Sequence, residues 1–553
     1  MATRSAQQDS QRLDMSKMTL DDEDMNLLFW AAAAGNTSKV QDCLSNGKHN
    51  IDRRVLKGRT AVMEASVRGK QTTFELLVTA GADLTLVDDD GDSCLILAIE
   101  GKNRAIIQKL LKKDKVNINS RGSENKTPVM VASLVGDFEI YDYLVSAGAD
   151  ISVCDSNGNT CLHLAAQSGC VKIVEHLLQK KFDINLRGQV GQTPLMMATF
   201  AAKKNVFDLL LAKGADMSLM DANNNGLLMM AVFSGDTSVL KTVLERGKLE
   251  INKAGEKGMT PAMMAALLGN KESFDLLLAA GADLTLKNEF GNDFLFWGAS
   301  GGNMKIVKYL LSLKKFDVNR QQEHGLSPLH IAITKGHKEV FDILVAENGD
   351  VNSRNDQLYN SLMIASDTGH VNIVRKLISM NKINLNEREE NGWTAVMIAA
   401  KCGHNEVFDV LVSSGADASL TDKDGNDCLM LACIYGQAVM VKHLLSMSMY
   451  NINRRGIYGW TPVMAAINEG HPEVFNILVE AGADMTLLDE RGSNCLILAC
   501  MGGNVTIVQQ LLSMKVFDLE YKGLDDSAVT AAAREGQTDV VQLLIDEGVR
   551  IDL

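Results

Sequence analysis

The chain of 553 residues is 46% hydrophobic and 22% charged, and its formal net charge at pH 7 is −14. Nucleic-acid binding needs a basic surface that displaces the counterions of the phosphates, so this charge argues against a nucleic-acid partner. No apolar run approaches the ~18 residues that a transmembrane helix requires. Residues 1–20 lack the apolar segment typical of a secretory signal. We therefore expect no membrane insertion and a cytoplasmic location, with the nucleus as the alternative.

The first 20 residues are polar, and we expect a disordered N-terminal tail there. From residue 21 to residue 553 the sequence repeats every 33 or 34 residues. The segment TPVMVASLVGDFEIYDYLVSAGADI, which begins at Thr127, aligns without gaps with the segments that begin at Thr160 and Thr193. The same register predicts one continuous array of sixteen units. Their first positions are Asn26, Thr60, Ser93, Thr127, Thr160, Thr193, Gly226, Thr260, Asp293, Ser327, Asn360, Thr394, Asp427, Thr461, Asn494 and Ser527.

Each unit is predicted to be a helix–turn–helix. Five of the six prolines directly follow a first position, where proline suits the first turn of a helix. Nine residues after the first position, fourteen of the sixteen units have a glycine, which favours a left-handed turn at the end of the first helix. The exceptions are Lys102 and Ala202. The last unit has charged residues on its expected outer surface, which is typical of a C-terminal cap.

A longer pattern of about 67 residues overlies the units, because steps of 33 and 34 mostly alternate. Cys94, Cys161, Cys428 and Cys495 occupy one slot of this longer pattern. At least two units separate any two members of this set, which puts them beyond the reach of a disulfide. No Cys or His cluster has the spacing of metal ligands, so we expect reduced, buried thiols and no metal site.

The period, the Thr-Pro-Leu-His-x-Ala core and the Gly-Ala-Asp turn resemble the ankyrin repeat over about residues 21–553. The segment SPLHIA at residues 327–332 comes closest to the family motif. In most units the histidine slot holds methionine, as at Met63 and Met397, which removes a side chain that ties neighbouring turns together in the family. The resemblance implies an all-α solenoid of stacked helix–turn–helix units, with short β-hairpin or turn loops between them.

The resemblance also implies a scaffold or adaptor that binds other proteins in the concave groove of the array. The sequence contains no Walker A loop, no GxGxxG after a strand, no HExxH and no GxSxG. We therefore expect no enzyme activity, no catalytic residues, no cofactor and no small-molecule substrate. Two alternatives remain open: a structural spacer or tether, and a regulatory subunit that targets an enzyme on another chain.

Candidate binding residues follow from the family, in which the seventh and eighth residues after the first position face the groove. In this chain several of them are apolar or aromatic, mainly in the N-terminal half. The predicted partner-binding residues are Leu134, Val135, Phe200, Phe233, Leu267, Leu268, Ile434 and Tyr435. The alternative is that these side chains pack against neighbouring helices and fill the stack.

Four asparagines resemble the sites that ankyrin repeats offer to asparaginyl hydroxylases. Each lies eight residues after a leucine: they are Asn119, Asn252, Asn319 and Asn453. The resemblance implies hydroxylation if the source organism has such an enzyme. The alternative is that each asparagine supports its turn by bonding its own backbone.

Overall fold

The computed structural model describes residues 26–47, 49–246, 249–524 and 526–549. The tail predicted for residues 1–20 lies outside the described residues. Within the described ranges, thirty-two α-helices form sixteen pairs, and the only β-structure is isolated bridges such as Val87 with Ser93. The predicted all-α fold of paired helices is therefore confirmed.

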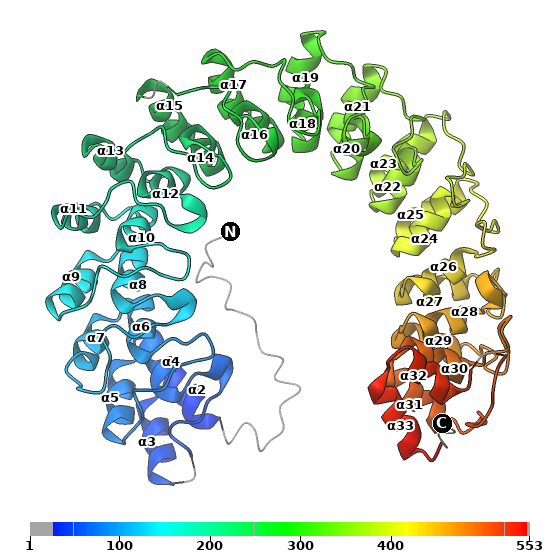
Figure 1. Cartoon of the computed structure of the whole chain (residues 1–553), viewed down its shortest axis with the longest axis horizontal. Coiled ribbons are helices and arrows are strands. Elements are labelled where there is room, and N and C mark those ends of the chain that lie inside the picture. Colours follow the sequence, from blue (N-terminus) through cyan, green and yellow to red (C-terminus); the bar gives the residue numbers. More distant parts are fainter. Residues whose placement is uncertain (1–25, 48, 247–248, 525, 550–553) are drawn as a thin grey trace. The chain divides into compact units, whose positions relative to one another are not determined.

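The chain divides within its eighth helix pair into two compact units, the first unit and the second unit, and each of them contains several of the 33- or 34-residue repeats. One consists of Met1–Met264 with Asp275–Asp283, and the other of Ala265–Phe274 with Leu284–Leu553. Figure 1 shows that, inside each unit, the first helices of successive pairs form one row and the second helices another. Stacking in rows buries the apolar face of each pair against its neighbours, as a repeat architecture requires.

The helices of the first unit are α2 (Leu27–Ala34), α3 (Thr37–Ser45), α4 (Ala61–Val67), α5 (Gln71–Thr79), α6 (Cys94–Glu100), α7 (Arg104–Leu110), α8 (Pro128–Val135), α9 (Phe138–Ser146), α10 (Cys161–Ser168), α11 (Val171–Gln179), α12 (Pro194–Phe200), α13 (Lys204–Ala212), α14 (Leu227–Ser234) and α15 (Thr237–Arg246). The eighth pair, within which the division falls, is α16 (Pro261–Leu267) and α17 (Lys271–Ala279). The helices of the second unit are α18 (Phe294–Gly301), α19 (Met304–Ser312), α20 (Pro328–Thr334), α21 (Lys338–Ala346), α22 (Ser361–Asp367), α23 (Val371–Ser379), α24 (Ala395–Cys402), α25 (Asn405–Ser413), α26 (Cys428–Ile434), α27 (Ala438–Ser446), α28 (Pro462–Asn468), α29 (Pro472–Glu480), α30 (Cys495–Gly502), α31 (Val505–Ser513), α32 (Ala528–Arg534) and α33 (Thr538–Asp546).

Each first helix begins one residue after a predicted first position. In α20, the Ser327 hydroxyl accepts a hydrogen bond from the His330 backbone N–H at 3.3 Å. The His330 ring accepts in return from the Ser327 backbone N–H at 3.4 Å. This reciprocal capping box satisfies two N–H groups that an uncapped helix leaves unpaired. Pro328 follows at the first helical position, as predicted.

The turn between the two helices has a left-handed backbone in every unit. Gly136, for example, has φ +73°. Lys102 and Ala202, which replace the glycine, adopt the same conformation with φ +55°. The turn therefore imposes this conformation even on residues that do not favour it.

The 67-residue pattern is also a pattern of the core. Phe294, in the first helix α18, is one of the seven largest fully buried aromatic side chains, and the other six lie in second helices at intervals of 66 or 67 residues. They are Tyr141, Phe207, Phe274, Phe341, Phe408 and Phe475. The four cysteines of the recurring slot are at most 1% exposed, each at the start of a first helix. One large aromatic side chain is thus buried in the second helix of every other unit from the fourth to the fourteenth.

Side chains that follow the turn glycine link neighbouring units. The Nε2 atom of His337 donates to the Ser300 carbonyl at 3.0 Å, and the Asn303 amide donates to the Gly269 carbonyl at 2.8 Å. His370, His404 and His471 make the equivalent bond at 3.0 to 3.2 Å. These histidines therefore hold the stack together.

The histidine slot inside the first helix also links units, and methionine does so less well. His163 Nε2 donates to the Leu186 carbonyl at 2.9 Å, and its Nδ1 lies 3.0 Å from the Thr160 hydroxyl. Where Met63 replaces the histidine, its sulfur accepts only the Thr60 backbone N–H at 3.5 Å. The buried Thr60 hydroxyl then has no hydrogen-bond partner within the described ranges. A methionine in this slot fills space without replacing the lost bonds.

Candidate partner-binding surfaces

The predicted binding residues lie at the ends of first helices, and they differ in exposure. The exposed ones are Leu134 (37%), Phe200 (42%), Leu268 (50%) and Tyr435 (43%). The half-buried ones are Val135, Phe233, Leu267 and Ile434. The half-buried side chains both fill the stack and reach its surface. For these residues, packing between helices and partner binding are therefore compatible roles.

Phe200 and Phe233 form one apolar surface in the first unit. Phe200 ends α12 and Phe233 lies in the last turn of α14. Their ring centroids are 6.5 Å apart, and the ring planes meet at 62° in an edge-to-face arrangement. Such pairs are favourable, and they leave a ring edge and a ring face for a further contact.

Leu134 is not part of this pair. It lies in α8, and α10 separates α8 from α12, with the half-buried Gln167 in the corresponding slot. Leu267 and Leu268 belong to the segment of the eighth helix pair that is grouped with the second unit. Within the first unit, the predicted residues that the structure brings together are therefore Phe200 and Phe233.

Tyr435, in the second unit, belongs to a cluster that the sequence reasoning missed. The Lys401 ammonium lies 4.5 Å from the centroid of the Trp393 ring and 5.0 Å from that of Tyr435. The two rings are nearly perpendicular, at 86°, with centroids 6.5 Å apart. Burial raises the pKa of Tyr435, so its phenol stays neutral at pH 7. We call Trp393, Lys401 and Tyr435 the Lys401 cluster, in which a cation is held against two rings.

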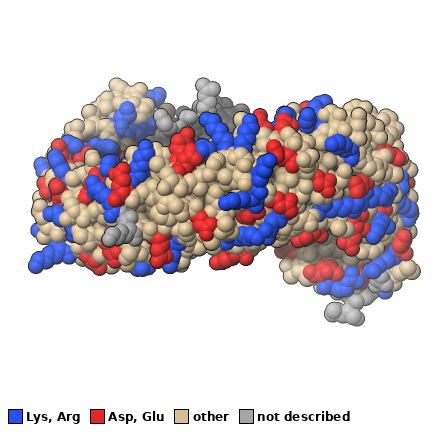
Figure 2. Space-filling model, turned by 90° about the horizontal axis from the view of Figure 1, so that it is seen from above, with Lys and Arg blue, Asp and Glu red and all other residues tan. Residues whose placement is uncertain are grey.

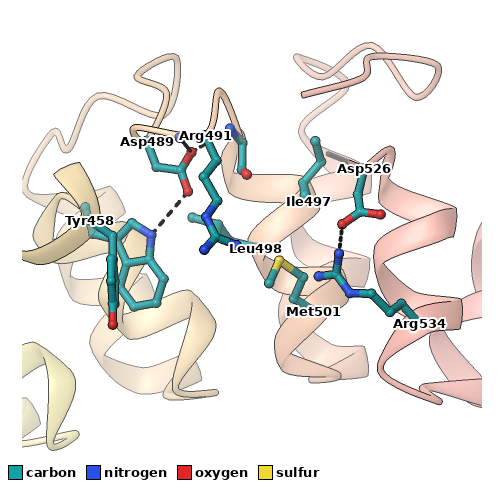
Figure 3. Close-up of a pocket in the computed structure, with 10 residues that line it drawn as sticks. Tyr458, Asp489, Arg491, Ile497, Leu498, Met501, Asp526 and Arg534 are labelled. Carbon is teal, nitrogen blue, oxygen red and sulfur yellow. Dashed lines mark hydrogen bonds and ion pairs between the residues drawn. The ribbon is translucent and has the colours of Figure 1, made fainter. Parts of the chain in front are cut away.

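A cavity of about 140 Å³ lies further along the second unit. It is lined by Tyr458, Trp460, Asp489, Arg491, Ser493, Ile497, Leu498, Met501, Asp526 and Arg534. In Figure 3, Tyr458 and Asp489 lie on one side of this Trp460 cavity and Asp526 and Arg534 on the other, with Met501 between them. Arg534 is ion-paired with Asp526. The walls therefore combine aromatic, aliphatic and charged groups, as in many binding pockets.

The sequence carried a signal for these sites. Trp393 and Trp460 each directly precede a motif threonine, 67 residues apart, and they are two of the four tryptophans in the chain. The binding residues were predicted from the seventh and eighth positions after the first position, which lie at the ends of the first helices. The Trp393 and Trp460 rings belong instead to the loops that lead into the first helices.

The four asparagines bond the next unit rather than their own turn. The Asn119 side-chain oxygen accepts from the Asp150 backbone N–H at 2.9 Å, and that of Asn319 accepts from Asp350 at 2.7 Å. Asn252 and Asn453 do the same with Asp283 and Asp484 at 2.9 Å. Hydroxylation of these residues stays a prediction, which peptide mass spectrometry tests by searching for one added oxygen atom.

No group of three or more His, Cys, Asp or Glu side chains in the described ranges is placed to hold a metal ion. The longest described helix, α15, has ten residues, and none of the described helices is long and apolar enough to cross a bilayer. All ten cysteines are unpaired, and burial raises the pKa of Cys94 to about 12. A thiol with that pKa is unreactive at neutral pH.

Comparisons with known proteins agree with this architecture. The family described as ankyrin repeats (3 copies) matches nine overlapping segments, from residues 28–122 to residues 481–553, which together span residues 28–553. The E3 ubiquitin-protein ligase KEG of Arabidopsis thaliana is 27% identical over 351 residues, which cover 62% of this chain and 19% of the ligase. The probable 26S proteasome regulatory subunit p28 of Saccharomyces cerevisiae is 27% identical over 192 residues, 34% of this chain and 84% of that subunit.

A third relative is the ankyrin repeat protein nuc-2 of Neurospora crassa, which is 25% identical over 252 residues. The match covers 45% of this chain and 20% of nuc-2. This chain thus spans about a fifth of the length of the ligase and of nuc-2. The sixteen helix pairs and a family match that spans residues 28–553 establish that the chain belongs to the ankyrin-repeat family.

Proposed function

We propose that this chain is a scaffold or adaptor without catalytic activity, which binds other proteins at the ends of its first helices. The observation that carries the proposal is the aromatic pair formed by the exposed Phe200 and the half-buried Phe233. Exposed apolar surface is typical of interaction sites, and aromatic anchors dominate the binding energy of many interfaces. A spacer would have no use for aromatic side chains at this position.

The charge distribution supports protein partners. Figure 2 shows Lys and Arg side chains mixed with Asp and Glu on the face in view. Together with the net charge of −14, this mixture disfavours a polyanionic partner such as nucleic acid. We place the protein in the cytoplasm or nucleus and assign it no cofactor and no small-molecule substrate.

A second candidate is a regulatory subunit that targets an enzyme on another chain. The similarity to the probable proteasome regulatory subunit p28 favours it, because the match extends over 84% of that protein. Both candidates need a protein-binding surface, and they differ in whether the bound partner is an enzyme whose activity changes.

The test is to replace Phe200 and Phe233 together by serine. Partners captured by the intact chain and identified by mass spectrometry are expected to be lost from the double variant, because a partner's apolar segment loses both rings. The melting temperature is expected to fall only modestly, since Phe200 is 42% exposed and Phe233 is half-buried. A matched control is Val439→Ser, which removes a 71% exposed apolar side chain from the second helix α27 and is expected to leave capture intact.

Two results would contradict this assignment. Capture that survives the double substitution would place the binding surface elsewhere. A melting temperature that collapses would show that the two rings stabilise the stack, as the packing interpretation holds.

A further inference from the structure

Two sites in the second unit are built in the same way around two tryptophans that are 67 residues apart, Trp393 and Trp460. The Trp393 indole N–H donates to the Asp422 carboxylate at 3.1 Å, and that of Trp460 donates to Asp489 at 3.3 Å. The other oxygen of Asp489 accepts two backbone N–H groups, from Arg491 at 2.9 Å and Ser493 at 2.7 Å. Each carboxylate is therefore fixed, and it fixes the tryptophan in turn.

The two sites differ in what contacts the tryptophan ring. In the first, the Lys401 ammonium and the Tyr435 ring lie against Trp393. The residues at the corresponding positions of the second site are Asn468 and Gly502. The Asn468 amide bonds Glu469 at 3.1 Å, and glycine has no side chain. At the first site the chain thus places a cation and an aromatic ring against Trp393. At the second site the two corresponding positions, Asn468 and Gly502, provide neither of them to Trp460.

The cavity beside Trp460 has the size of the missing ring. Its volume is about 140 Å³. A protein cavity of about 150 Å³ accommodates a benzene ring. Ile497, Leu498 and Met501 provide apolar walls, and a methionine sulfur makes favourable contacts with aromatic rings. An aromatic side chain therefore fits this space in both volume and chemistry.

Tyr458 is held against the cavity at an unfavourable backbone conformation. Its φ is +57° and that of Gly459 is +72°, which is the turn geometry that favours Asn-Gly. The Tyr458 ring is 57% exposed and packs edge-on against Trp460, with centroids 5.4 Å apart. The same left-handed turn precedes a glycine at Lys57, Val190, Lys257 and His324, so it belongs to the repeat. At this position the turn presents the Tyr458 ring beside Trp460.

The rim of the cavity carries more negative than positive charge. The cavity itself is lined by the carboxylates of Asp489 and Asp526 and the guanidinium groups of Arg491 and Arg534. Two more carboxylates belong to residues next to it, because the Glu490 side chain lies beside Gly459 and Glu535 pairs with Arg534. Arg534 is paired with two of these carboxylates, those of Asp526 and Glu535. The rim is thus complementary to a basic ligand.

We propose that the Trp460 cavity is a docking site for a basic, aromatic-containing segment of a partner protein. An aromatic side chain of the partner fills the cavity, and a neighbouring lysine or arginine lies on the Trp460 ring. The partner then supplies the pair that Lys401 and Tyr435 supply to Trp393. The inference rests on the proposed function of protein binding, and adds a site with its own specificity in the second unit.

Fluorine NMR of the full chain labelled with fluorinated tryptophan tests this site directly. The chain has four tryptophans, Trp30, Trp297, Trp393 and Trp460, whose signals are assigned with single Trp→Phe variants. The probe is the capped peptide Gly-Tyr-Lys-Gly, and its charge-reversed control is Gly-Tyr-Glu-Gly. The basic peptide is expected to shift the Trp460 signal saturably and to leave that of Trp393 in place. The acidic peptide should bind about fivefold more weakly.

Two variants sharpen the test. Tyr458→Asn creates the favoured Asn-Gly turn, so the melting temperature is expected to hold or rise while the peptide binds about tenfold more weakly. Lys401→Ala with Tyr435→Ala opens the first site, where the Trp393 signal is then expected to respond to the same peptide.

The proposal is overturned if neither peptide shifts the Trp460 signal, or if the acidic peptide binds more tightly. It is also overturned if the Trp460 signal depends on protein concentration alone, because the occupant is then a second copy of this chain. The two proposals can fail separately. If the Phe200 and Phe233 double variant loses its partner but no peptide shifts the Trp460 signal, the proposed function is supported and only the Trp460 docking site is rejected.

Discussion

His330 couples the folding of its unit to pH. The ring is fully buried, its Nε2 donates to the Ser353 carbonyl at 3.1 Å, and burial lowers its pKa to about 4. In the unfolded chain a histidine has a pKa of about 6.5. Between these two values the unfolded state binds a proton that the folded state does not. The stabilising contribution is therefore complete above about pH 6.5 and falls as the pH drops toward 4.

The variant His330→Met isolates this effect, because methionine occupies the same slot at Met63 and Met397. Thermal unfolding of both proteins between neutral pH and about pH 4.5 is expected to show a steeper loss of stability in the wild type. The difference in unfolding free energy should change by about 3 kcal/mol at most across the window. Parallel pH profiles would contradict the burial of a neutral ring.

Single residues also show how far the sequence alone could go. The register placed Phe200 and Phe233 at the surface end of their helices, because both belong to a slot with a fixed position in the repeat. The Trp460 cavity could not be predicted in this way. It depends on the residues that meet Trp460 from other units, and on the absence of a side chain at Gly502.

At the scale of the helix pair, the turn between the two helices controls local stability. The glycines predicted its left-handed backbone. They did not predict that Lys102 and Ala202 adopt the same conformation. Propensity alone disfavours it for both residues, and the packed helices on either side impose it.

Ala202 and Gly235 occupy this turn in adjacent units, with φ +55° and +69°. Ala202→Gly is expected to stabilise the protein by about 1 kcal/mol, because it relieves the strain. Gly235→Ala is expected to destabilise it by a similar amount, since the added methyl group meets no atom within 4 Å and reports backbone strain alone. Chemical denaturation measures both, and shifts of the same sign would contradict the account.

At the scale of the whole molecule, a stack of repeats transmits stability mainly between neighbours. Leu210 is fully buried in α13, and Leu210→Ala should cost about 2–5 kcal/mol locally. Hydrogen exchange followed by mass spectrometry is expected to rise in α12, α13 and the adjacent helix pairs, and to stay unchanged from α20 onward. Faster exchange throughout the chain would instead indicate a single cooperative unit.

Binding should follow the same division. The aromatic pair of the first unit and the Trp460 cavity of the second unit offer different chemistry, so we expect them to bind separate partners or separate segments of one partner. The two rows of helices differ as well, because the first-helix ends carry the aromatic pair, whereas six of the seven largest fully buried aromatic side chains lie in second helices.

The most direct test of the central claim is site-specific photo-crosslinking. A photoreactive benzoylphenylalanine takes the place of Phe200 at the end of the first helix α12, and in a control protein the place of the exposed Val439 in the second helix α27. If partners bind at the first-helix ends, a captured partner becomes covalently linked at position 200 and not at position 439. Crosslinks at position 439 without any at position 200 would contradict it.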